Sequence, residues 1–257
     1  MFNIEDFDIK LDTANLGRNF IYAEEISSTN SYLMSSDQKL QNGTLFLAEY
    51  QTNGKGRLDR IWTSQKNSNL TFSILLKDVN KLSEINLINL ATSLAIAQSI
   101  ENLFQLNIEV KWPNDILIKR KKVAGILSES SIIGKRIDKI VVGIGINVNQ
   151  TLFTGKYLIQ PTSLRIEKKR IINREKLLSE LLNILEEALQ LAKDDPAKLL
   201  NDWRARCKMI GEIVKIESEN VSKVGIFEDI DKNGSLILKV KDGHEKFYFG
   251  DVSLRKI

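Results

Sequence analysis

The chain has 257 residues, of which 42% are hydrophobic and 27% charged, a composition typical of a soluble globular protein with a sizeable core. A formal net charge of +4 is too small to indicate nucleic-acid binding. The single cysteine, Cys207, excludes an internal disulfide framework, and no apolar run is long enough to span a membrane. The N-terminus carries acidic residues and lacks the cationic start of a secretory signal, so we expect a cytoplasmic protein.

The first half of the chain is predicted to contain strands and one long helix. Short runs of large apolar side chains predict buried strands at residues 45–48 and 71–76. Between these strands lies the polar sequence QTNGKGRLDRIW, residues 51–62. Apolar residues then recur at helical spacing, in two stripes, over residues 83–104. This pattern predicts a helix that is buried on more than one side.

The middle of the chain is predicted to form further strands. Residues 108–112 predict a short strand, and the apolar runs 116–118 and 123–127 flank a charged turn, KRKK, which predicts a hairpin. Residues 139–147 predict another buried strand, whose glycines let a ligand or another backbone approach closely. The KRKK turn could contact nucleic acid, but as a solvated turn it needs no partner.

Two helices and a group of short strands are predicted in the remainder of the chain. A leucine-rich stripe after Asn173 predicts a helix, and Asp195-Pro196 supplies the N-cap and first residue of a shorter one. Beyond Gly211, short apolar runs are separated by Asn-Gly and Asp-Gly, which favour tight hairpins. We therefore predict two domains, a large one at residues 1–208 and a small all-β one at 209–257.

The loop between the first two strands has the composition of a phosphate site. Its glycines allow backbone N–H groups to point at an anion, and its cations supply charge. One hypothesis is a loop that folds over phosphate; the alternative is an ordinary basic surface loop, because short glycine motifs match by chance. The residues concerned are Gly54, Lys55, Gly56, Arg57, Arg60 and Trp62.

A hydroxyl-rich stretch, Ser27-Ser-Thr-Asn30, precedes a short amphipathic run. Either Ser28 or Thr29 could simply be the N-cap of a helix. Alternatively, the spare hydroxyl and amide groups of this stretch could hydrogen-bond a small polar ring.

The stretch Lys111-Trp-Pro-Asn-Asp115 places a lysine at the end of a predicted strand, where ligand sites form in open α/β folds. Asn114 and Asp115 could orient this lysine or help to hold a metal. The alternative is ordinary turn chemistry with a solvated lysine. His244, the only histidine, lies in a predicted turn, so we expect neither a histidine-based triad nor a zinc site.

Taken in order, five segments resemble the biotin protein ligases: SSTNSYL, AEYQTNGKGRLDRIW, KWPNDIL, KVAGILSES and GIGINVN. The C-terminal runs GIFEDIDKNGSLIL and DVSLRKI are similar to the small terminal barrel of that family, so the resemblance extends from about Ile21 to the end. It implies an α/β fold with a mixed sheet and flanking helices, of the type shared with class II aminoacyl-tRNA synthetases. A small Src-homology-like β-barrel is expected to follow.

The resemblance also implies an enzyme with two half-reactions. Biotin and ATP, with Mg²⁺, give biotinyl-5′-adenylate and pyrophosphate, and the biotinyl group then passes to a lysine of a biotin carboxyl carrier protein of acetyl-CoA carboxylase. Only 26 residues precede Ser27, too few for the DNA-binding domain of some family members, so we expect no repressor role and no DNA partner. The alternatives are a lipoate ligase and a non-catalytic binding module.

Matched positions within each motif imply roles for individual residues. The implied catalytic residues are Lys111 and Arg57. The implied biotin-binding residues are Ser28, Thr29, Asn30, Gln51, Lys55, Gly56, Arg57 and Lys111. The implied ATP-binding residues are Gly54, Arg57, Arg60, Trp62 and Asn147. No metal ligand is assigned, since Mg²⁺ is expected to bind through the phosphates.

Two loop residues depart from the family pattern. Lys55 stands where an arginine is usual, and it keeps the charge but loses the bidentate guanidinium. Asp59 stands where a glycine is usual and adds an anion. The hypothesis is a leakier adenylate intermediate than in a ligase with the usual loop. Asp115 could accept the proton of the acceptor amine, but the sequence does not distinguish this role from metal binding or loop structure.

Overall fold

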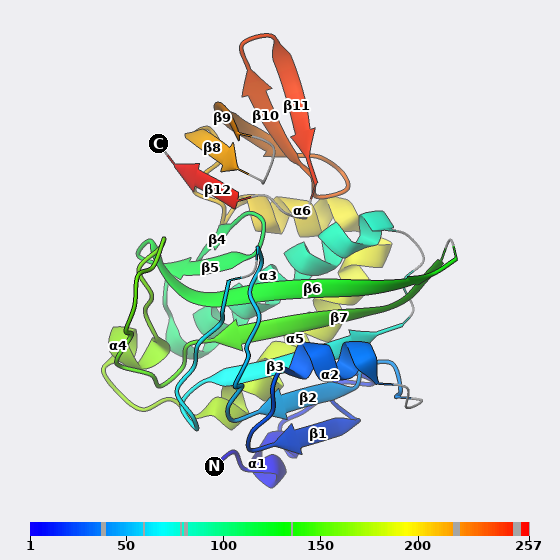
Figure 1. Ribbon diagram of the computed structural model, residues 1–257, viewed down its shortest axis with the longest axis vertical. Helices are drawn as coiled ribbons and strands as arrows, with labels where there is room; N and C mark the ends of the chain where they lie inside the picture. The colour runs from blue at the N-terminus through cyan, green and yellow to red at the C-terminus, as the bar shows by residue number, and fades with distance from the viewer. Residues whose placement is uncertain are drawn as a thin grey trace.

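Figure 1 shows the computed structural model, which describes residues 1–36, 40–58, 60–77, 79, 82–134, 136–217, 222–248 and 253–256. Within these residues the chain forms a seven-stranded mixed sheet, with helices on both faces, and a five-stranded antiparallel sheet. The predicted fold class, a mixed α/β sheet followed by a small β domain, is confirmed.

The large sheet begins with one parallel pair, β1 with β2, and its other neighbours are antiparallel. The predicted hairpin is confirmed as β5 and β6, and the predicted strand at 139–147 is confirmed as β7, but β6 is much longer than the apolar run that predicted it. Beyond Leu127, β6 continues through the polar residues 128–130, so the apolar run ends before the strand does. In spatial order the strands are β1 Phe20–Ala23, β2 Leu45–Ala48, β3 Leu70–Leu76, β7 Arg136–Ile146, β6 Lys121–Ile133, β5 Asp115–Ile118 and β4 Glu109–Lys111.

Both faces of the central strands are buried, which explains their nearly continuous apolar sequences. Successive side chains of a strand point to opposite faces. Phe46 and Leu75 therefore pack against α2 on one face, whereas Leu47 and Phe72 join the large core on the other. In Figure 1, α2 lies on one side of the sheet and α3 and α5 lie on the other. The helices are α1 Ile4–Asp8, α2 Thr29–Ser35, α3 Leu82–Phe104, α4 Leu164–Lys168, α5 Arg174–Asp194 and α6 Pro196–Arg204.

The small C-terminal sheet packs onto the large domain through a turn and through Asp229 and Ile230, which accept hydrogen bonds from Arg204 of α6 at 2.6 and 2.8 Å. Its strands are β8 Ile213–Glu217, β9 Ser222–Ile230, β10 Leu236–Val240, β11 Gly243–Phe247 and β12 Ser253–Lys256, in the spatial order β11-β10-β9-β8-β12. Gly234, in the turn between β9 and β10, accepts a hydrogen bond from the indole Nε1 of buried Trp112 at 3.2 Å. The apolar residues of both sheets belong to one continuous core.

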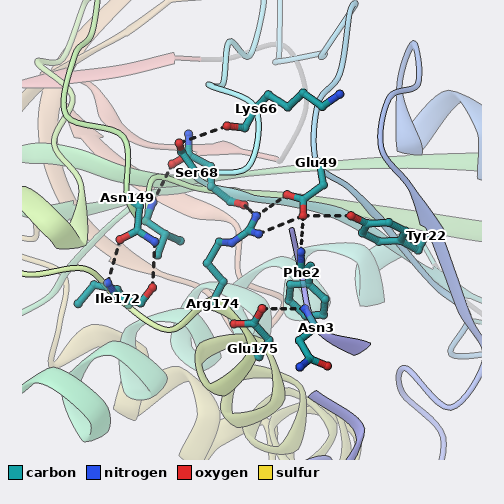
Figure 2. A network of polar contacts seen from close by, with 12 residues as sticks. Phe2, Asn3, Tyr22, Glu49, Lys66, Ser68, Asn149, Ile172, Arg174 and Glu175 are labelled. Atoms are coloured by element: carbon teal, nitrogen blue, oxygen red, sulfur yellow. Dashed lines mark hydrogen bonds and ion pairs between the residues drawn. The ribbon is translucent and has the colours of Figure 1, made fainter. Parts of the chain in front are cut away.

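A buried ion pair joins the end of β2 to the start of α5. The guanidinium of Arg174 donates to both carboxylate oxygens of Glu49, and also to the carbonyl oxygen of Asn69 at 3.1 Å. The same carboxylate accepts the backbone N–H of Phe2 at 2.7 Å and the hydroxyl of Tyr22 at 3.1 Å. Figure 2 shows these contacts converging on one carboxylate. The network ties the N-terminus, β1, β2 and α5 together.

No helix in the described ranges combines the length and the apolar character that a membrane span requires.

Replacing Arg174 with leucine leaves the Glu49 carboxylate buried without its guanidinium. We expect the free energy of unfolding, measured by urea denaturation, to fall by about 3–5 kcal/mol at pH 7. Burial raises the pKa of Glu49, but Arg174 and the other donors lower it by more, so its net pKa lies below the ordinary value of 4.5. Removing Arg174 raises the pKa of Glu49 in the folded variant. The difference between wild type and variant is therefore largest at neutral pH, and it shrinks as the pH falls and Glu49 becomes protonated, first in the variant and then in the wild type.

The control for this measurement is Lys66→Met, which removes an exposed partner 3.6 Å from Glu24. An exposed pair contributes less than about 1 kcal/mol, so this variant should remain close to wild type. Equal losses in the two variants, or a loss in Arg174→Leu that does not change with pH, would contradict the role given to the buried pair.

Candidate active site

A cavity of about 680 Å³ lies between the start of α2, the loop of residues 51–63, the turn after β4 and the segment 153–161. Strands β6 and β7 contribute to its wall. The structure brings all predicted site residues except Gly54 into its lining: Ser28, Thr29, Asn30, Gln51, Lys55, Gly56, Arg57, Arg60, Trp62, Lys111 and Asn147. A Cβ on Gly54 would lie 2.3 Å from the carbonyl oxygen of Trp62, so this glycine permits a tight turn inside the loop.

A chain of hydrogen bonds joins polar residues at the start of α2. Ser28 is the N-cap of the helix, as one of the two interpretations predicts, and its hydroxyl accepts a backbone N–H at 3.3 Å. The Oε1 of Gln51 accepts both the N–H and the hydroxyl of Thr29, at 2.7 and 3.0 Å. The hydroxyl of Ser73, on β3, lies 2.6 Å from that of Thr29 and donates to Asn30 at 2.5 Å. These side chains are therefore held in fixed orientations.

Glu129 on β6 connects this polar cluster to the loop of residues 51–63. Its carboxylate accepts a hydrogen bond from the Nδ2 of Asn30 at 2.8 Å and lies 3.7 Å from the ammonium group of Lys55. The loop itself is folded back, with a bridge between Lys55 and Ile61. Lys55 is therefore placed against the cavity wall, and Asp59, the second departure from the family pattern, lies outside the described residues.

Two glycines of β7 make room for site side chains rather than for another backbone. A Cβ on Gly143 would lie 2.2 Å from the Oδ1 of Asn30, and one on Gly145 would lie 2.3 Å from the indole of Trp62. On β6, a Cβ on Gly125 would lie 3.3 Å from the same indole. The indole therefore lies flush against the sheet. This explains the glycines of the GIGIN motif by side-chain packing.

The indole nitrogen of Trp62 is buried and has no hydrogen-bond partner among the described residues. A buried N–H without a partner costs about 1–3 kcal/mol, so such groups are rare in folded proteins. The ring itself lines the cavity, so a bound molecule that displaces it slightly could supply the missing acceptor.

A cluster of cations surrounds one carboxylate, that of Asp115, at the turn after β4. The ammonium group of Lys111 lies 3.7 Å from the Oδ2 of Asp115, and the ammonium group of Lys122 contacts its Oδ1. Arg57 donates to the side-chain oxygen of Asn114 at 3.1 Å, which brings the glycine loop onto the turn after β4. The resemblance, which implied a shared catalytic role for Arg57 and Lys111, also implied that the loop and this strand end meet.

The electrostatics of this cluster depend on burial and on mutual contacts. Burial lowers the pKa of Lys111, with Lys122 and Arg60 acting in the same direction and Asp115 opposing. Burial raises the pKa of Asp115, but Lys122, Lys111 and Arg57 lower it by more, so the net pKa lies below its ordinary value. An ionised carboxylate engaged by two lysines is a weak proton acceptor. The contacts therefore favour an orienting role for Asp115.

Asn147, at the end of β7, lines the cavity and also connects neighbouring segments. Its Nδ2 donates to the carbonyl oxygen of Thr162 at 3.1 Å, and its backbone N–H donates to Val123 at 2.8 Å. Its side chain is thus fixed by the segment that closes this side of the cavity.

The sequence analysis missed three residues of the site. Ser73 lies within an apolar strand, Glu129 within a polar strand, and Lys122 within a predicted solvated turn. Simple alternation along β6 would place Lys122 and Gly125 on opposite faces. The register of β6 against β5 is irregular between Lys122 and Ala124, and no local pattern in the sequence predicts that irregularity. Among the described residues, no group of three or more His, Cys, Asp or Glu side chains could hold a metal ion.

The fold and the cavity define an enzyme-like site in which a rigid polar cluster adjoins a group of cations. A family model described as "Biotin/lipoate A/B protein ligase family" matches residues 22–147, and one described as "Biotin protein ligase C terminal domain" matches residues 209–255.

Individual relatives agree with these matches. The chain is 32% identical over 250 residues to the bifunctional ligase/repressor BirA of Bacillus subtilis, covering 95% of this chain and 76% of that protein. It is 32% identical over 206 residues to the biotin--[acetyl-CoA-carboxylase] ligase of Mycobacterium tuberculosis, covering 77% of this chain and 74% of that one. The structure of the biotin protein ligase from Aquifex aeolicus in complex with biotin and ATP matches with a TM-score of 0.82 at 29% identity, covering 93% of this chain and 100% of that one. The chain belongs to the biotin protein ligase family.

Adding a methyl group to either glycine of β7 should displace a different site residue. Gly145→Ala forces the indole of Trp62 off the sheet, so we expect its fluorescence emission to move to longer wavelength as the ring becomes exposed. Gly143→Ala displaces Asn30 instead and should leave the emission unchanged, because Trp112 and Trp203 are buried elsewhere. Each variant should lose about 1–3 kcal/mol of stability through overpacking. Identical spectra for the two variants would contradict this description of the floor of the site.

Proposed function

We propose that the protein activates biotin with ATP to biotinyl-5′-adenylate, releasing pyrophosphate, and then transfers biotin to a lysine of a biotin carboxyl carrier protein of acetyl-CoA carboxylase. The observation that carries this proposal is the single cavity in which the hydrogen-bonded polar cluster and the cations of the glycine loop meet. The membership of this chain in the biotin protein ligase family supports the same reaction.

The first half-reaction joins two anions, since the carboxylate of biotin attacks the α-phosphate of ATP. Cations must offset their repulsion, and preorganised ones do so most effectively. In the proposed mechanism Lys111 and Arg57 stabilise the transition state, and Lys55 and Arg60 add charge from the loop. The contacts of Lys111 with Asp115 keep its ammonium group in place before any substrate binds.

The polar cluster at the start of α2 is proposed to bind the ureido ring of biotin. This ring has donors and an acceptor, which must be paired when they are buried. The orientations of Thr29, Asn30 and Gln51 are already fixed by hydrogen bonds to one another and to Ser73. We include Ser28 and Gly56 in this subsite. Lys55, Arg57 and Lys111 are proposed to lie near the carboxylate of biotin.

ATP is proposed to bind beside this cluster. Trp62 offers an aromatic ring, and Asn147 offers an amide group in the same cavity. Gly54 and Arg60 belong to the same subsite. The donor set here is mainly cationic, and its carboxylate, Asp115, is engaged by two lysines. We therefore propose that Mg²⁺ is held chiefly by the phosphate oxygens, whose charge it offsets when bound.

The second half-reaction is proposed to take place in the cytoplasm, where a free buried thiol such as that of Cys207 remains reduced. We retain the division into a catalytic domain at residues 1–208 and a C-terminal domain at 209–257. The partners are biotin, ATP and the carrier protein; no contact with DNA is proposed.

Biotin-dependent exchange of labelled pyrophosphate into ATP tests the first half-reaction. We expect exchange by the wild-type protein and a loss of about 10²-fold or more in Lys111→Ala, because a preorganised charge is removed from the transition state. Lys121→Ala is the matched control, since Lys121 is exposed in the neighbouring hairpin and does not line the cavity.

Lipoate distinguishes the nearest alternative function. Exchange with lipoate but not with biotin would retain the reaction class and change the substrate. A folded wild-type protein that catalyses no exchange with either acid would overturn the proposal and favour a binding module.

The two departures of the loop are tested by retention of the adenylate. We expect Lys55→Arg combined with Asp59→Gly to retain labelled biotinyl-adenylate several times longer than wild type, because guanidinium pairs with the Glu129 carboxylate through two donors where ammonium offers a point charge. Release is measured by gel filtration of the preformed complex. Lys55→Met is the converse control and should release faster. Equal release from the wild type and the double variant would contradict the hypothesis.

A further inference from the structure

Lys122 is the one residue of the KRKK stretch that lines the cavity. Lys119 and Arg120 form the exposed turn, and their backbone φ angles of 49° and 64° reverse the chain direction there. Lys121 is exposed on β6, whereas the Lys122 side chain points to the opposite face and is 28% exposed. The solvated stretch expected from the sequence therefore ends at Lys121, and Lys122 belongs to the site.

The ammonium group of Lys122 contacts the Oδ1 of Asp115, while that of Lys111 lies 3.7 Å from Oδ2. The side chain of Asp115 is only 15% exposed. One carboxylate is thus held between two lysines, one from β4 and the other from β6. Because Lys122 occupies one oxygen, the other oxygen is directed at Lys111.

The same ammonium group also lies against the Trp62 ring. Its Nζ is 5.7 Å from the ring centroid, within range of a cation–π interaction. A Cβ on Gly125 would lie 3.1 Å from the Cε and Nζ of Lys122 and 3.3 Å from the indole, so this glycine leaves space for both side chains.

The backbone of Lys122 is anchored on its outer edge as well. Its N–H donates to the carbonyl oxygen of Gln160 at 2.8 Å, and its carbonyl oxygen accepts the N–H of Thr162 at 2.9 Å. The backbone of Lys122 is therefore held by residues 160–162. From this fixed position its side chain reaches Asp115 and Trp62.

We propose that Lys122 is a positioning residue of the adenylation site, holding through one ammonium group both the Asp115 carboxylate that orients Lys111 and the Trp62 ring that lies on the sheet. This inference rests on the proposed function for its effect on catalysis. It assigns Lys122 no contact with substrate: the residue acts through Asp115 and Trp62.

The charges around Asp115 give the pH dependence of this role. The charged groups that face it are Lys111 on β4, Lys122 on β6 and Arg57 on the glycine loop; Arg60 faces Lys111. Removing Lys122 takes away a cation that lowers the pKa of Asp115, so this pKa rises. Asp115 then becomes protonated, and ceases to orient Lys111, at a higher pH than in the wild type.

The test compares Lys122→Met with Lys122→Arg and with the exposed neighbour control Lys121→Met. In biotin-dependent pyrophosphate exchange we expect Lys122→Met to lower kcat on the order of 10- to 100-fold, with little change in KM for biotin. The acid limb of its pH profile should move to higher pH. Lys122→Arg should recover much of the activity, because guanidinium pairs with carboxylate and stacks on indole. Lys121→Met should match the wild type throughout.

A second readout does not depend on activity. In ¹⁵N-labelled protein, the indole N–H resonance of Trp62, assigned with Trp62→Phe, should shift and broaden in Lys122→Met but not in Lys121→Met. The indoles of Trp112 and Trp203 donate to Gly234 and Ser93 and should remain unchanged in both variants.

These readouts separate the two hypotheses. If the wild type catalyses no exchange, the proposed function is wrong, and the Trp62 resonance alone then decides the role of Lys122. An unchanged resonance in Lys122→Met, or wild-type kcat with an unshifted acid limb, would overturn the positioning role. A similar loss in Lys121→Met would attribute the effect to the net charge of the hairpin and would overturn it as well.

Discussion

The buried ion pair of Glu49 and Arg174 is the constraint on which the arrangement of the site depends. Glu49 directly follows β2 and stands two residues before Gln51, while Arg174 is the first residue of α5. Separating the pair would leave an uncompensated charge in the core, so alternative positions of β2 and α5 are strongly disfavoured. The loop that carries the site cations therefore starts from a fixed point, although none of the ion pair's atoms lines the cavity.

The site itself is held together by short-range contacts that are complete before a substrate binds. The α2 cluster is satisfied within itself, and the cations share one carboxylate. Such preorganisation removes the need to reorient dipoles and charges during the reaction, which is the main advantage of a folded site over water. The indole N–H of Trp62 is the exception, because it is buried and has no hydrogen-bond partner among the described residues.

Periodicity and turn chemistry predicted most of the fold because they are local. The strands β2 and β3, the helix α6 with its Asp195 cap and the hairpin of β5 and β6 all follow from patterns within a few residues. The motifs likewise predicted most of the cavity lining. What could not be predicted depends on contacts between distant segments. Examples are Ser73, which is polar within a buried strand, and Lys122, which belongs to a charged run but points inward.

The hydrogen bond from Trp112 to Gly234 has a consequence for how the protein unfolds. It joins the residue next to Lys111 to a turn of the C-terminal sheet, and both sheets share one hydrophobic core. A boundary at residue 209 therefore divides the sequence without dividing the cooperative unit. Opening of the small sheet would break this bond to the buried indole of Trp112. The small sheet therefore helps to hold the side chain that follows Lys111 in the sequence.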